Sequence, residues 1–191
     1  MAAAATRRRL CAAVLDGRPL ESSVIWYPDE MRGLALGNCR ECWGAGVKWR
    51  VGLSGRPYPC GCALRTIFRQ CLAGYRRCEA NCGSYAAARL SVGIRGAKRF
   101  QCWGLPEQEY CADFCLLGRQ ALSGLKYRIF RLHFVAGLPW TECVRRLRIE
   151  RGNFFHETYL VEQRMGYALR TLKPYALHPV NEYFCGINGG R

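Results

Sequence analysis

The segment GLPWTECVRRLRIERGNFFHETYLVEQR, residues 137–164, decides the fold that the sequence predicts. Its apolar residues Cys143, Val144 and Leu147 fall on one face at helical spacing, and a second helical pattern begins at Phe154. The segment therefore predicts two helices that share one core. Because the residues before it are also helical in pattern, the predicted fold class is mainly α.

The residues at the ends of these two patterns are typical of helix boundaries. Gly137 can end the preceding helix, and Pro139 has the fixed backbone angle of a first helical turn. Gly152 is expected to provide the sharp bend between the two helices, with Asn153 as the N-cap of the second. The last long helix is expected to stop before Pro174.

The segment resembles the C-terminal helix-turn-helix of bacterial sigma factors. That pattern is Gly-Leu-Ser-aromatic-x-Glu, a small apolar pair, Leu, Gly-Ile and then Gly-Thr-Val, and it aligns here without a gap. The sequence departs from it at Arg148, where the family has a glycine, and over 155–157, where the family is rich in Arg and Lys. The resemblance implies a helical DNA-binding domain whose second helix enters the major groove. The matching residues are Gly137, Leu138, Trp140, Glu142, Leu147, Ile149 and Gly152.

Arginines and polar residues near the predicted turn are the candidate contacts to double-stranded DNA. Arg145, Arg146 and Arg148 are expected to approach the backbone phosphates. Asn can pair with adenine, and an aromatic ring can touch the methyl group of thymine. Phe155 and Tyr159, four residues apart, could equally be core residues. The remaining predicted contacts are Arg151, Asn153, Phe155, His156 and Tyr159.

The charge of the chain favours a polyanionic partner. It carries 29 Lys and Arg against 14 Asp and Glu, a formal net charge of +15. Such an excess promotes association with phosphates through counterion release, although adhesion to ribosomes or membrane surfaces is an alternative. With 50% hydrophobic residues the chain can bury a core.

Four of the 13 cysteines have the spacing of a metal site. Cys39 and Cys42 form a CxxC pair, and Cys60 and Cys62 form a CGC pair. Without an export signal, metal binding is a better explanation of these cysteines than a disulfide framework. Four thiolates predict one structural Zn²⁺, because a closed four-cysteine site leaves no position for a substrate. Cys71 could compete with the CGC pair.

The stretch CRECWGAG also resembles the CxxCxGxG unit of the J-protein chaperone zinc domain. That domain has four copies of the unit and this chain has one, so the prediction is a small zinc knuckle. A second metal could use cysteine pairs four residues apart, although core packing is the alternative for them. The pairs are Cys78 with Cys82 and Cys111 with Cys115, and Cys71 is a further candidate ligand.

The chain divides into five predicted segments. The helix that follows the cysteines should turn Ile67, Cys71 and Tyr75 inward. The segments are an N-terminal arm with a short apolar stretch (1–36), the zinc knuckle and a basic helix (37–82), a Gly-rich connector (83–115), the helix-turn-helix domain (116–175) and an extended C-terminal tail (176–191).

Two further classes of function are disfavoured by the sequence. No apolar run is long enough to span a bilayer and the N-terminal apolar run is too short for a secretory signal, so a cytoplasmic protein of a bacterial cell is expected. The three histidines and the scattered acidic residues form no catalytic pattern, and no phosphate-binding GxxxxGK[ST] loop is present. The protein is therefore not expected to be an enzyme.

A zinc module joined to a basic helix-turn-helix resembles the late antiterminators of lambdoid phages, the Q proteins. The resemblance implies a DNA-binding transcription regulator of phage or prophage origin that could act with RNA polymerase. One alternative is a zinc-dependent module that binds polymerase or a chaperone without reading DNA. Another is an RNA-binding module, favoured if Trp43, Trp49 and Trp103 are exposed for base stacking.

Overall fold

The computed structural model describes residues 26–49, 57–91, 105–171 and 177–185, and it is mainly helical, as predicted. In the described ranges, no helix is both long and apolar enough to cross a membrane. The elements in chain order are α2 (Pro28–Leu34), β1 (Val47–Trp49), β2 (Pro57–Pro59), α3 (Gly61–Ser91), α4 (Leu105–Ala121), α5 (Gly124–Ile129), the π-helical η1 (Phe130–Val135), α6 (Trp140–Leu147), α7 (Arg151–Thr171) and α8 (Val180–Cys185).

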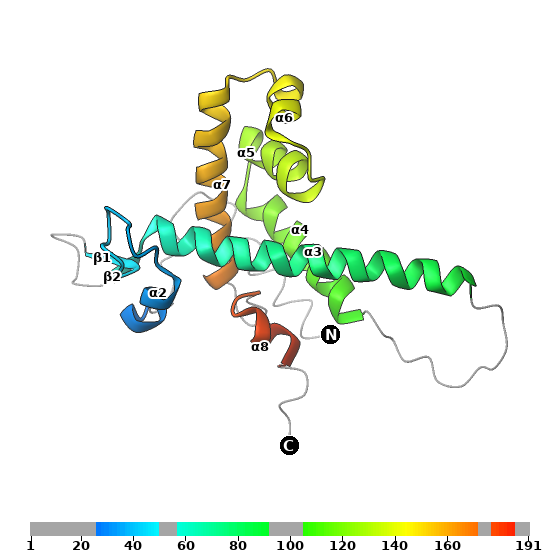
Figure 1. Ribbon diagram of the computed structural model, residues 1–191, viewed down its shortest axis with the longest axis horizontal. Coiled ribbons are helices and arrows are strands. Elements are labelled where there is room, and N and C mark those ends of the chain that lie inside the picture. The colour runs from blue at the N-terminus through cyan, green and yellow to red at the C-terminus, as the bar shows by residue number, and fades with distance from the viewer. Residues whose placement is uncertain (1–25, 50–56, 92–104, 172–176, 186–191) are drawn as a thin grey trace.

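The long helix α3 is the element on which the others are arranged (Figure 1). Helix α7 crosses it, α4 packs along it, and α2 with the two short strands lies near its N-terminal end. Helix α6 and the start of α7 project away from α3 at the upper end of the view. The fold therefore separates the four predicted metal ligands from the predicted DNA-contact residues on α6 and the start of α7, whereas the predicted contact Tyr159 lies beside Gly61.

Aromatic side chains fill the core between α3, α4 and η1. The ring of Phe68 meets that of Phe134 edge-on at 4.9 Å between centroids, and Tyr75 stacks on Phe114 at the same distance. Ile67 and Tyr75 are buried together with Cys71, which confirms the predicted inward face of this helix. These three residues recur every four positions, so they lie on one face of α3.

Helices α3 and α7 cross at close range. A Cβ atom at Gly166 would overlap the backbone carbonyl oxygen of Leu64, so the absence of a side chain is required there. Beside this point the buried carboxylate of Glu162 pairs with Arg65 and with Arg69, whose Nε lies 3.2 Å from Oε1. The crossing holds the N-terminal end of α3 against α7.

The two predicted helices of residues 137–164 are present as α6 and the first part of α7. Cys143, Leu147 and Phe154 are buried, as the apolar periodicity predicted. The backbone has the left-handed conformation at Arg148 (φ 54°, ψ 49°), and its N–H donates to the carbonyl of Val144. The chain therefore turns at an arginine where the sigma-factor pattern has a glycine.

The predicted bend at Gly152 is wrong. Helix α7 begins at Arg151, so Gly152 and Asn153 lie inside its first turn and Asn153 is not an N-cap. Leu147 is buried and Ile149 packs against the core, and anchoring on both sides of Arg148 accounts for the left-handed conformation of a residue that is not glycine.

Several element bounds differ from the expected segments. Helix α3 continues to Ser91, into the stretch expected to be a connector from residue 83, and α4 (Leu105–Ala121) crosses the expected boundary at 116. Helix α8 (Val180–Cys185) replaces part of the extended tail predicted for 176–191. Helix α7 ends at Thr171, before Pro174, as expected. The arm over 1–25 and the connector residues 92–104, with Trp103, lie outside the described ranges.

Candidate metal centre and nucleic-acid surface

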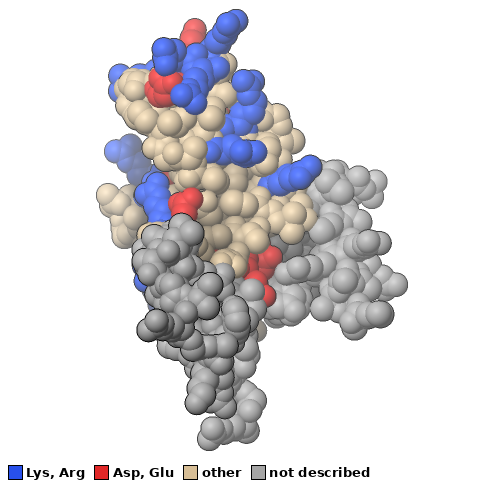
Figure 2. Space-filling model, turned by 90° about the vertical axis from the view of Figure 1, so that its right-hand side faces the viewer, with Lys and Arg blue, Asp and Glu red and all other residues tan. Residues whose placement is uncertain are grey.

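Most of the predicted DNA-contact residues lie at one end of the molecule. Figure 2 shows Lys and Arg side chains gathered over the upper end, where α6 and the start of α7 lie. We call α6, the turn 148–150 and the first turns of α7 the α6–α7 surface. Its exposed side chains include Arg145, Arg146, Arg148, Arg151, Asn153 and His156.

Two of these arginines already have a carboxylate partner. Glu142 accepts hydrogen bonds from Arg145 Nε at 3.0 Å and Nη2 at 2.8 Å, and from Arg146 Nε at 2.6 Å. These bonds, led by those from Arg145, lower the pKa of Glu142 from 4.5 to about 2. Arg148 and Arg151 have no carboxylate partner among the described residues. The charge available to a polyanion is therefore greatest at the turn and at the start of α7.

The aromatic residues of this segment have different surroundings. Phe155 is 46% exposed, and its ring lies 5.7 Å from that of Trp140. The guanidinium of Arg151 lies over both rings, 5.1 Å from the Trp140 centroid and 5.7 Å from that of Phe155. Tyr159 is instead half-buried against α3, with the guanidinium of Arg65 4.7 Å from its ring. The contact of Arg151 with Trp140 was not predicted from the sequence.

The four predicted metal ligands come from three neighbouring elements. Cys39 and Cys42 lie in the turn between α2 and β1, Cys60 directly follows β2, and Cys62 lies in the first turn of α3. The strands pair antiparallel with Val47 opposite Pro59, and Cys60 N–H donates to the carbonyl of Gly46 at 2.8 Å. This pairing brings the two cysteine pairs together. We call residues 37–49 and 57–62 the cysteine module.

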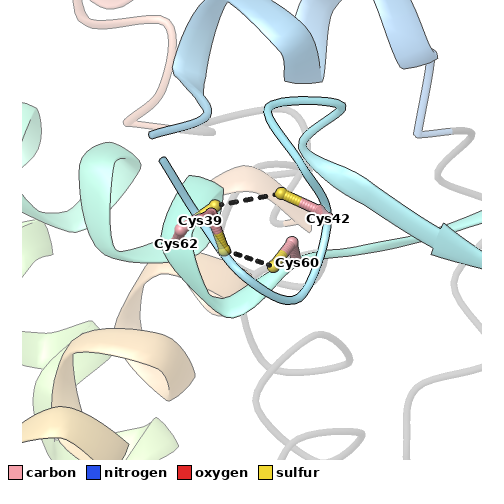
Figure 3. Close-up of side chains that lie close together, drawn as sticks. All are labelled: Cys39, Cys42, Cys60 and Cys62. Atoms are coloured by element: carbon pink, nitrogen blue, oxygen red, sulfur yellow. Dashed lines mark hydrogen bonds between the residues drawn. The ribbon is translucent and has the colours of Figure 1, made fainter. Parts of the chain in front are cut away.

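The four sulfur atoms converge on one point (Figure 3). All lie within 4.8 Å of one another, with Cys39 Sγ 3.8 Å from Cys60 Sγ and Cys42 Sγ 3.5 Å from Cys62 Sγ. Three of the four side chains are buried, and Cys39 is partly exposed. The cluster could bind one metal ion, as the cysteine spacing predicted.

Backbone hydrogen bonds fix the turn that carries Cys39 and Cys42. The N–H of Trp43 donates to Cys39 O, and the N–H of Ala45 donates to Cys42 O, both at 2.8 Å. Gly46 has a positive φ of 73°, and a Cβ atom there would overlap the backbone of Met31 in α2. The turn therefore packs closely against α2 and also presents two sulfur atoms to the cluster.

Charges beside the sulfurs are balanced locally. Glu41 forms an ion pair with Lys48, which holds the pKa of that carboxyl below its usual value, and its Oε2 lies 3.6 Å from Cys60 Sγ. Burial raises the pKa of the Cys60 and Cys62 thiols, whereas the backbone N–H of Glu41 lowers that of Cys39 to about 7. A bound cation would favour the thiolate form of all four.

The remaining described cysteines do not form a second site of this kind. The buried thiol of Cys71 donates to the carbonyl of Leu177 at 3.7 Å, so it belongs to the helical core and not to the first cluster. Across the ranges that the structure describes, only the first cluster brings three or more metal-binding side chains together. Cys78, Cys111 and Cys115 belong to the hydrophobic core of α3 and α4 or pack against it.

Comparison with models of protein families, with curated proteins and with solved structures finds no match to this chain. The geometry and chemistry of the cysteine module and of the α6–α7 surface are therefore the basis for a proposed function.

Proposed function

We propose that the protein binds double-stranded DNA through the α6–α7 surface. The observation that carries this proposal is the group of exposed arginines at the turn, of which Arg148 and Arg151 have no carboxylate partner in the described part of the chain. Unpaired arginines attract phosphates and release their counterions. Asn153 and His156 lie exposed on the first turns of α7, where they can hydrogen-bond to base edges.

The exposed first turns of α7 can enter a DNA groove. The major groove of B-DNA admits a single helix, and contacts to phosphates on either side fix its register. Helix α7 begins within the exposed surface and continues into the core, where Val161 and Met165 are buried. Its first turns would thus enter the groove from a rigid support, with Arg145, Arg146 and Arg148 near the backbone.

We propose that the ion of the cysteine module is Zn²⁺. Zn–S bonds of about 2.3 Å in tetrahedral geometry place neighbouring sulfurs about 3.8 Å apart. The separations of 3.8 Å and 3.5 Å between paired sulfurs fit this value. Since four cysteines would fill the coordination sphere, the ion would fix the module to α3 and leave no position for a substrate.

We further propose that the protein regulates transcription. Antitermination with RNA polymerase as a partner, and a phage or prophage origin, remain predictions from the resemblance to the Q proteins. The main alternative is a module that binds a protein partner without reading DNA. The two differ in the salt dependence of binding, because only the DNA complex releases many counterions.

The test is the affinity of the metal-loaded protein for a fluorescent duplex at two salt concentrations. The variant R148A/R151A is expected to bind at least about tenfold more weakly and to lower the salt slope by about 2. The control variant R76A/R77A removes the same charge from exposed positions on α3. Equal losses in both variants, or binding that is insensitive to salt, would overturn the proposal.

A further inference from the structure

Trp43 occupies an unfavourable backbone conformation and is also exposed. Its φ of 51° lies in the left-handed region, where a side chain is strained and glycine is favoured. Its indole is 84% exposed, and no aromatic ring in the described part of the chain packs against it. The position thus combines backbone strain with exposure of a large apolar side chain. A strained residue that is not glycine is a reason to look for a function.

The backbone beneath this indole is rigid. Trp43 directly follows the ligand Cys42, and its N–H donates to Cys39 O at 2.8 Å. The next residue, Gly44, also has a positive φ, of 82°. The cysteine cluster therefore fixes the base of the side chain and leaves the ring projecting into solvent. A second tryptophan of the cysteine module, Trp49 on β1, is 63% exposed.

The charge that accompanies these rings is positive. Among residues 37–49 the charged side chains are Arg40, Glu41 and Lys48, and Glu41 is paired with Lys48. Arg40 is exposed and has no carboxylate partner in the described ranges. The module therefore presents flat apolar rings together with unpaired positive charge. Unstacked nucleobases and their phosphates have the complementary properties.

We propose that the cysteine module binds single-stranded nucleic acid, with a base stacked on Trp43 and a second base on Trp49. Stacking on an aromatic ring needs no particular sequence, because every base has a flat face. In a duplex those faces are covered by neighbouring bases, so the module selects single strands. This site is separate from the α6–α7 surface and does not depend on duplex binding there.

The test uses the full-length, metal-loaded protein and a single-stranded RNA of about 12 nucleotides, followed by fluorescence anisotropy. The variant W43G is expected to bind at least about tenfold more weakly, the loss of one stacked base. Because glycine suits the left-handed backbone, its metal content and unfolding midpoint should stay equal to those of the natural chain or rise. W49A should weaken binding less, and L116A, which shortens an exposed leucine of α4, should leave it unchanged.

Two results would overturn the proposal. One is that W43G, with its metal content intact, binds the RNA as well as the natural chain. The other is that R148A/R151A abolishes RNA binding whereas W43G does not, which would place the strand on the α6–α7 surface. Retained RNA binding in R148A/R151A supports a separate site, whatever the outcome of the duplex experiment.

Discussion

The cysteine module and the α6–α7 surface are held in place by different kinds of interaction. In the α6–α7 region, Cys143, Leu147 and Phe154 belong to the same core as α3 and α4. In the module, Val47 reaches that core, whereas Cys42, Cys60 and Cys62 form a small cluster of their own beside two three-residue strands. A cluster of that size buries too little apolar surface to order its loops. The α6–α7 region is thus held by the shared core, and we expect the module to depend mainly on the ion that its four sulfurs could bind.

Removal of the metal should have the largest effect, and the loss of structure should be confined to the cysteine module. Structural zinc contributes about 10 kcal/mol or more to the folding of small zinc modules. Treatment with a chelator is therefore expected to abolish the hydrogen-exchange protection of the amides of Trp43, Ala45 and Cys60. The amides of α6 and of the first turns of α7 should keep their protection. Simultaneous loss of protection in both regions would show that they are one cooperative unit.

Single cysteine replacements also test the difference between the cysteine module and the α6–α7 region. Cys60→Ala removes one of the four sulfurs and is expected to lower the metal content per chain from about one to near zero. Cys143→Ala removes a buried cysteine of α6 that lies outside the cluster. This control should retain the metal and lose only global stability, by about 1 kcal/mol. Metal analysis and urea unfolding distinguish the two effects.

A substitution where α7 crosses α3 should have the next largest effect. Gly166→Ala would place a Cβ against the carbonyl oxygen of Leu64, where α7 meets α3, and backbone cannot move aside as a side chain can. We expect a loss of about 2–3 kcal/mol in urea unfolding. Gly152→Ala is the matched control, because its Cβ would meet no atom within 4 Å in the first turn of α7. It should raise stability by about 0.5–1 kcal/mol. Similar losses in both variants would refute the close crossing.

Local spacing made the four-cysteine cluster predictable from the sequence. The members of each pair, Cys39 with Cys42 and Cys60 with Cys62, are close in sequence, so their spacing limits how far apart their sulfur atoms can lie. Helical periodicity likewise predicted the buried face of α3 that includes Ile67. In both cases the pattern that allowed the prediction links residues close in sequence.

Contacts between residues far apart in sequence were not predictable in this way. Tyr159 stands on the same helix as Asn153, but it packs on Arg65 of α3, and no local pattern indicates that partner. The turn at Arg148 depends on how its neighbours are buried, not on its own preference for the left-handed conformation. Gly166 likewise must lack a side chain because the backbone of Leu64, distant in sequence, lies against it.

Glu142 gives the smallest predicted effect and the finest test of the α6–α7 surface. Its carboxylate holds Arg145 and Arg146, so it competes with phosphates for both. Its pKa is lowered to about 2, so the charge and its ion pairs are complete above the ordinary value of 4.5 and are lost only as the pH falls toward 2.

Glu142→Gln should therefore tighten duplex binding by about two- to fivefold, equally between about pH 5 and 8. Glu150→Gln removes the same charge from the adjoining turn, where no described arginine pairs with that side chain. If Glu150→Gln tightens duplex binding as much as Glu142→Gln does, the change in net charge alone would explain the gain. The release of Arg145 and Arg146 from Glu142 would then not be its cause.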